Sequence, residues 1–251
     1  MVVFVKEENK KENAERRMAK GTCSGMCPEK ERYVRVVQKR ISPYECNPDG
    51  SLNPNLLVKE YARSAADQDK PLPHELRSKE LLENTMSYLF QHVLDCPPKN
   101  EDDLATWYDF LWSRTRAIRK EITQLMLTDK TAVALIERCA RLHILCAYQL
   151  CRLSFEKFDQ NMNTENLAKC ARLHILCAYQ LCCLSFEKFD QNMNTENLAK
   201  CLQSLRHLYE DLAAQGITLD TEAEFRSYDV MLHLYDSNIL RQASFCCFCV
   251  S

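Results

Sequence analysis

The stretch DDLATWYDFLWSRTRAIRKEITQLML, residues 102–127, predicts one long amphipathic helix. It opens on two acidic residues, which favour the positive end of a helix dipole. Its large apolar residues recur at helical spacing along one stripe: Trp107, Leu111, Ile118, Ile122 and Leu125. A stripe of this kind is typical of a helix that packs by one face against a core. The first four of these residues are therefore the candidate core anchors.

Helical patterns continue on both sides of this stretch. Residues 78–95 start at Ser78, a suitable N-cap, and place apolar residues at alternating intervals of four and three. Residues 128–153 are apolar almost all round, which predicts a long buried helix, and residues 27–41 and 56–68 predict two further helices. With only 4 glycines and 8 prolines, the chain has too few turn residues for a many-stranded sheet. The predicted fold class is all-α.

Length, charge and cysteine content limit the classes of protein to which this chain can belong. A chain of 251 residues can bury a real core, and a formal charge of −2 gives no overall attraction to nucleic acid. No apolar run approaches the roughly 20 residues that a membrane span needs. The 15 cysteines are odd in number and follow no signal peptide, which favours reduced thiols in the nucleus or cytosol. We expect residues 1–20 to form a flexible charged arm and residues 243–251 an atypical cysteine-rich tail.

The sequence CARLHILCAYQLC occurs twice. Residues 139–169 and 170–200 align without gaps and differ only at Arg152 against Cys183. Units of true solenoids diverge much more, because each unit meets different neighbours. The unit also begins in mid-helix, so its insertion adds a single helix and reverses the chain that follows in an antiparallel stack. The pattern favours a late insertion or a gene-model error, with a working repeat as the alternative.

Removal of the second copy would join Lys169 to Cys201. The joined sequence TENLAKCLQSLRHLYEDLAAQG predicts one unbroken helix. Its apolar residues stay in register along one face: Leu202, Leu205, Leu208 and Leu212.

Several long segments resemble, in this order and at similar spacings, the Sac-three/GANP family. They are GTCSGMCPEKER, VKEYARSAADQ, PLPHELR, WYDFLWSRTRAIRKEITQ and TENLAKCLQSL. The Trp-Tyr-Asp-Phe and arginine-rich segment is closer to the branch of the germinal-centre-associated nuclear proteins than to the shorter centrosomal relatives. The resemblance predicts one domain of this family over residues 21–242.

The resemblance implies a fold, a function and partners. The implied fold is a TPR-like, right-handed helical superhelix, an α-solenoid, with the family's winged-helix half missing from this chain. The implied function is that of a non-enzymatic scaffold of the nuclear-pore-associated transcription-export (TREX-two) complex in mRNA export. The implied partners are a PCI-domain subunit and a small acidic subunit, with RNA as a further candidate. The implied location is the nucleus and the nuclear envelope at the pore, with the cytoplasm as an alternative.

Two of the expected helices carry basic stripes that are candidate contacts for nucleic acid or a partner. The stripes consist of Arg32, Arg35 and Lys39 on the first helix, and Arg114, Arg116, Arg119 and Lys120 on the longer one. Arginine suits phosphate contact because its planar fork grips phosphate at two places, and an acidic partner is the other candidate. A solvated surface is the plain alternative. Aromatic residues are not obviously interleaved on these faces, so specific RNA recognition is not supported.

For the cysteines and the histidine that could carry chemistry, the sequence predicts packing roles. Cys23 and Cys27 lack a second pair at matching spacing, which tetrahedral zinc requires. His143 and Cys146 lie three apart on one helical face, but a nucleophile and its base also need a third, orienting group. No phosphate-binding glycine loop or hydrolase motif is present. We expect no catalytic, metal or cofactor site and no small-molecule substrate.

Three functions follow from these observations. The first is the non-enzymatic scaffold. The second is a module that binds RNA or single-stranded DNA directly through the basic helix faces. The third is a centrosome- or spindle-associated factor like the shorter relatives.

Overall fold

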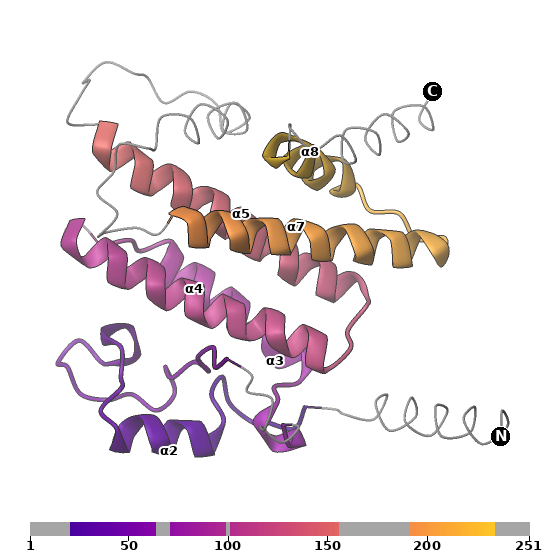
Figure 1. Cartoon of the computed structure of the whole chain (residues 1–251). Coiled ribbons are helices and arrows are strands. Elements are labelled where there is room, and N and C mark those ends of the chain that lie inside the picture. The colour runs from indigo at the N-terminus through magenta and orange to yellow at the C-terminus, as the bar shows by residue number, and fades with distance from the viewer. Residues whose placement is uncertain (1–20, 64–70, 99–100, 156–190, 234–251) are drawn as a thin grey trace, which may run out of the picture. The chain divides into compact units, whose positions relative to one another are not determined.

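The computed structural model describes residues 21–63, 71–98, 101–155 and 191–233, with the backbone alone at 101–102, 147–155 and 191. The expected charged arm and the expected cysteine-rich tail lie outside the described residues. Every regular element in the described part of the chain is helical (Figure 1), and the β-type pairing there is limited to two isolated bridges. The predicted all-α class is confirmed. The right-handed superhelical arrangement stays a prediction.

The chain divides into two compact units. The first comprises Met1–Pro98 with Thr106–Leu127, and the second comprises Lys99–Ala105 with Thr128–Ser251. The first unit holds α2 (Glu29–Val37), η1 (Pro43–Glu45), η2 (Pro73–Glu75), α3 (Lys79–Leu89), η3 (Phe90–Leu94) and most of α4 (Glu101–Gln124). The second holds α5 (Lys130–Phe155), α7 (Gln191–Ala214) and α8 (Glu222–Leu232). Of the helices described, none is long and apolar enough to cross a membrane.

Buried apolar residues of α3, η3 and α4 contribute to the core of the first unit. Ser78 caps α3 as predicted, because its hydroxyl oxygen accepts the N–H of Leu81 at 3.2 Å. The apolar stripe of α3 and η3 is buried along its whole length: Leu82, Met86, Leu89 and Val93. From α4, the buried stripe consists of Trp107, Leu111, Ile118 and Ile122. Trp107 also ties α4 to η3, since its indole N–H donates to the Val93 carbonyl at 2.8 Å.

The glycine-containing start of the described chain lies along the η2 segment. Thr22 and Cys23 donate their backbone N–H groups to the carbonyls of Pro73 and Leu76 at 2.8 and 2.9 Å. A Cβ at Gly21 would lie 2.2 Å from the carbonyl oxygen of Arg77. Only glycine permits this close approach of two backbones.

The helix predicted over residues 56–68 is wrong for its described part, because residues 57–63 form no regular secondary structure. Their backbone groups bond to distant partners instead of to one another. The N–H of Val58 donates to Glu45, that of Glu60 to Glu31 and that of Tyr61 to Ser113. Tertiary hydrogen bonds thus replace the helical ones that the composition favoured.

In the second unit, α7 packs on α5 and α8 packs on α7. The predicted leucine face of α7 is buried, through Leu202, Leu205, Leu208 and Leu212, and Leu198 is buried as well. The buried carboxylate of Glu137 on α5 accepts hydrogen bonds from the hydroxyls of Tyr209 on α7 and Thr221 beside α8. Arg141 on α5 reaches α8, where it donates to Glu224 at 2.8 Å. Polar ties therefore join all three helices.

The two copies of the duplicated sequence contribute different parts of this unit. The described part of the first copy, residues 139–155, lies in α5, which ends at Phe155. The helix α7 starts at Gln191, within the second copy. α7 then runs without a break from the second copy into Cys201 and the residues that follow. The remaining residues of both copies, 156–190, lie outside the described residues.

Candidate functional site: the basic helices α2 and α4

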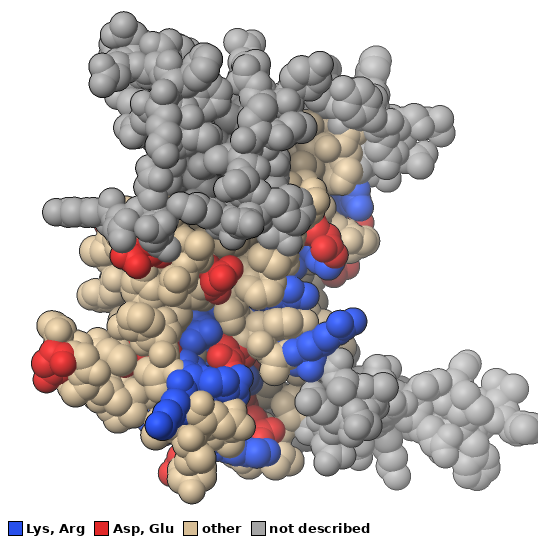
Figure 2. Space-filling view, turned by 60° about the vertical axis from the view of Figure 1, so that its left-hand side comes forward, with Lys and Arg blue, Asp and Glu red and all other residues tan. Residues whose placement is uncertain are grey.

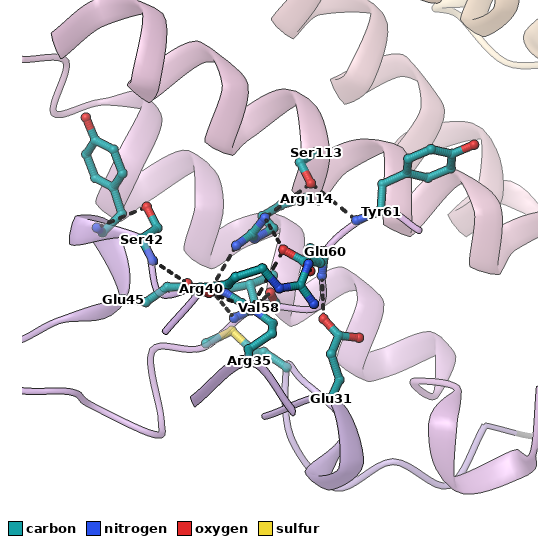
Figure 3. A network of polar contacts seen from close by, with 12 residues as sticks. Glu31, Arg35, Arg40, Ser42, Glu45, Val58, Glu60, Tyr61, Ser113 and Arg114 are labelled. Atoms are coloured by element: carbon teal, nitrogen blue, oxygen red, sulfur yellow. Dashed lines mark hydrogen bonds and ion pairs between the residues drawn. The ribbon is translucent and has the colours of Figure 1, made fainter. Parts of the chain in front are cut away.

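Two arginines of the predicted basic stripes converge on one buried carboxylate (Figure 3). Arg35 of α2 forms a hydrogen-bonded ion pair with Glu45, and Arg114 of α4 pairs with the other carboxylate oxygen at 3.2 Å. The N–H of Val58 donates to that oxygen as well, at 3.1 Å. All three charged side chains are buried.

Ion pairs and hydrogen bonds keep the buried carboxylate of this cluster ionised. Burial opposes ionisation of Glu45, but the two guanidinium groups and the Val58 N–H outweigh it, so its pKa lies below the ordinary value. Glu60, at the rim, lies 3.7 Å from Arg35 and 3.8 Å from Arg114, and Arg40 pairs with it at 3.0 Å. The cluster joins α2, the loop after it and α4 into one unit.

A second buried cluster fastens the η2 segment to the same helix. Arg77 donates to Glu121 of α4 at 2.7 Å, and Lys59 forms an ion pair with the other oxygen of Glu121. Lys59 also donates to the Glu75 carbonyl at 2.6 Å. Removal of one partner from such a group leaves an uncompensated buried charge, which is strongly destabilising. Both clusters therefore serve the packing of the first unit.

The expectation that Arg35 and Arg114 belong to exposed basic faces needs correction. Arg35 is completely buried and Arg114 is 5% exposed. The physical reason is Glu45, a buried carboxylate at the end of η1 that has to be neutralised inside the unit. The other predicted contact residues lie nearer to solvent: Lys39 is exposed, and Arg32, Arg116, Arg119 and Lys120 are half-buried.

An aromatic group accompanies the α4 cations, contrary to the expectation from the sequence. The Arg116 guanidinium lies 4.0 Å from the ring centroid of Tyr61 and 5.0 Å from that of Trp112. Lys120 donates to the Ala62 carbonyl at 2.8 Å and lies 5.8 Å from the Tyr61 ring centroid. Trp112, four residues before Arg116, was a signal in the sequence. Tyr61 was not, because it comes from the irregular segment 57–63, far from α4 in the sequence.

Of the cysteines and the histidine that the sequence singled out, Cys27, Cys146 and His143 are buried and Cys23 is half-buried. Burial, the largest of several effects, raises the pKa of the Cys27 thiol to about 12, and the thiol of Cys23 donates to the Gly25 carbonyl at 3.1 Å. Burial likewise raises the pKa of Cys146 well above its ordinary value. A thiol held protonated is a poor nucleophile and a poor metal ligand. Among the residues that the structure describes, no group of three or more His, Cys, Asp or Glu is arranged to hold a metal ion.

These features define an all-α domain whose buried polar groups fasten one helical element to another. The particular family follows from comparison with known proteins. The chain belongs to the SAC3/GANP family, whose model matches residues 26–172 and 168–246. The two matches meet at the junction of the duplicated copies.

Individual relatives cover most of this chain. It is 39% identical over 224 residues to the protein xmas of Drosophila melanogaster, a match that covers 88% of this chain and 9% of xmas. It is 35% identical to SAC3 family protein 1 of Schizosaccharomyces pombe, with coverage of 89% and 18%. It is 33% identical to SAC3 family protein B of Arabidopsis thaliana, with coverage of 85% and 11%. The chain thus spans less than a fifth of each of these relatives.

Proposed function

We propose that this chain is a non-enzymatic scaffold domain that acts in mRNA export as part of the nuclear-pore-associated TREX-two complex. The observation that carries the proposal is its membership of the SAC3/GANP family over nearly its whole length. The architecture supports it, because buried ion pairs hold the described helical elements of the first unit together, as the rigid frame of a scaffold requires.

The proposed partners are a PCI-domain subunit and a small acidic subunit, and the proposed location is the nucleus and the nuclear envelope at the pore, with the cytoplasm as the alternative. Co-expression of the full chain with both subunits, followed by nuclease treatment and gel filtration, tests the assignment. We expect the three proteins to elute together after the nucleic acid is removed. Separate elution of this chain at micromolar concentration would contradict the scaffold role.

A direct nucleic-acid-binding module is the second candidate, and the Arg116 group favours it. Tyr61 and Trp112 hold the Arg116 guanidinium in place, and Arg119 and Lys120 follow on the same helix. Such a combination of positive charge and aromatic surface is typical of proteins that bind single strands. Salt titration of binding to a fluorescent RNA tests it, because phosphate contacts make the affinity fall steeply with salt. No binding at low salt would remove this candidate. The centrosome or spindle role stays a prediction.

A further inference from the structure

The helix α2 is packed with its charged side inward and its apolar side outward. Its one buried residue is Arg35, which the Glu45 cluster holds. Its large apolar residues face solvent, with Tyr33 72% and Val37 62% exposed, and Val34 and Val36 less so. Elsewhere in the described chain, large apolar residues with this exposure occur singly, at Leu72 and Met126. A contiguous exposed apolar patch commonly marks an interaction surface.

The four apolar residues form one face. At 3.6 residues per turn, positions 33, 34, 36 and 37 cover an arc of about 160° whose centre lies opposite Arg35. The ion pair of Arg35 therefore fixes which side of the helix points outward. Rotation of α2 to bury the valines would expose the arginine and leave Glu45 without one of its two buried partners.

Charges of both signs border this face: Glu29, four residues before Tyr33, and Lys39 are exposed, and Arg32 is half-buried. Arg32 and Lys39 form no ion pair with any described residue, while Lys30 and Arg40 pair with Glu75 and Glu60 at the edge. Figure 2 shows Lys and Arg gathered in the lower part of the face that it displays, with Asp and Glu among them. Of the two acids in α2, Glu31 is half-buried and accepts the Glu60 N–H at 2.8 Å.

We propose that the outward face of α2, formed by Tyr33, Val34, Val36 and Val37, docks an amphipathic helix of a partner protein. The partner helix presents an apolar stripe flanked by Asp or Glu, which Arg32 and Lys39 contact. An apolar stripe at helical spacing matches the ridge that α2 offers, and the free cations select acidic flanks. This inference does not rest on the proposed scaffold function.

The chemistry of the face distinguishes a protein partner from nucleic acid. The three valines of the face offer no hydrogen bonds to bases or phosphates, and its single tyrosine gives one stacking platform. An apolar partner surface gains binding free energy by burying these side chains. Each side chain contributes in proportion to the apolar area that is removed from water. The surrounding charges then determine which apolar helices bind and in which orientation.

Binding of designed helical peptides to the full chain tests the proposal. One fluorescent peptide carries a leucine stripe flanked by Glu, and its counterpart carries Lys at the same positions. We expect the Glu peptide to bind at least about tenfold more tightly, with an affinity that falls as salt rises. The double variant Tyr33→Ser/Val37→Ser should weaken it by about tenfold or more, because anchor residues carry most of the binding energy. Arg32→Glu/Lys39→Glu should remove the preference for the Glu peptide.

Matched controls separate this face from general surface effects. Met126→Ser removes an exposed apolar residue elsewhere in the same unit, and Lys130→Glu reverses an exposed charge, so neither should alter peptide binding. The Tyr33→Ser/Val37→Ser variant should keep the wild-type circular dichroism and melting temperature. Equal binding of both peptides, unchanged binding by this variant or its unfolding would each overturn the proposal. So would peptide-independent dimerisation of the chain through these residues, or RNA binding that depends on Arg32 and Lys39 but not on Tyr33.

Discussion

His143 of α5 and Asn194 of α7 are joined by two hydrogen bonds. The Asn194 amide N–H donates to the His143 carbonyl at 3.1 Å, which directs the amide oxygen towards His143 Nδ1 at 2.9 Å. Because that oxygen can only accept, Nδ1 carries the proton. The histidine belongs to the first copy of the duplicated sequence and the asparagine to the second. The interface between α5 and α7 is thus assembled across the two copies.

This pair provides an internal comparison between the copies. Asn194→Ala should lower the free energy of unfolding by about 1 to 3 kcal/mol, because it leaves buried polar groups of His143 without this partner. Asn163 is the matching residue of the first copy and lies outside the described residues. Asn163→Ala should leave the stability unchanged, as measured by urea unfolding. Equal losses in the two variants would mean that the copies exchange places against α5.

Glu45 should control both the stability and the acid sensitivity of the first unit. Glu45→Gln removes the negative charge between Arg35 and Arg114 and should cost about 3 to 5 kcal/mol, the usual range for a broken buried pair. Since the folded pKa of Glu45 lies below its ordinary value of 4.5, its stabilisation is complete above that pH. Below it, the unfolded state takes up the proton first, and the free energy of unfolding falls with pH.

Urea unfolding from pH 7 down to pH 3 measures both effects. The slope of stability against pH below about 4.5 should be smaller in Glu45→Gln than in the wild type. The solvent-exposed pair of Lys30 and Glu75 provides the control, and Lys30→Ala should change little. Equal slopes in wild type and Glu45→Gln would show that other carboxylates dominate the acid response.

Trp107 is expected to anchor the first unit. It is 1% exposed and its indole N–H donates to the Val93 carbonyl. Trp107→Ala should therefore lower the free energy of unfolding by about 3 to 5 kcal/mol. Trp107→Phe keeps much of the volume and removes the donor, so thermal unfolding of both variants separates packing from hydrogen bonding. A nearly neutral Trp107→Ala would contradict a core role for this face of α4.

The α4 cations should affect binding more than folding. Simultaneous replacement of Arg116, Arg119 and Lys120 by Glu leaves the buried stripe untouched, so the helical signal should persist. Affinity for a fluorescent RNA should drop, and the dependence on salt should become shallower, because fewer phosphates are contacted. Lys130→Glu is the matched charge control. Loss of the helical signal would show instead that these cations are needed for packing.

Periodicity made α3, α4, α5 and the leucine face of α7 predictable, because one side of each helix has to be apolar to be buried. It could not locate Arg35 and Arg114, since both depend on Glu45 of η1, which lies outside the α-helical patterns and 69 residues from Arg114. The irregular course of residues 57–63 escaped prediction for a related reason. Its backbone donors bond to Glu45, Glu31 and Ser113, and no local pattern indicates these contacts.

The sequence that flanks each copy of the duplicated segment explains why the first copy belongs to α5 and the second copy to α7. Before the first copy stands an apolar run that includes Val133 and Leu135, both buried in α5. The second copy is followed by the leucine face of α7 from Leu202 onward. Figure 1 shows that α5 ends and α7 begins on the same side of this helix pair. A short connection suits such antiparallel neighbours.

Thermal unfolding of a variant that lacks residues 160–190 tests this fold most directly. The deletion joins Asp159 to Gln191, leaves the same sequence as removal of residues 170–200, and connects α5 to α7 through the four residues 156–159. Connections of this length are typical between packed helices. We expect a higher midpoint and less aggregation than for the full chain, with the hydrogen bonds between His143 and Asn194 retained. A clearly lower midpoint would contradict this, because loss of a working repeat unit breaks an interface between neighbours.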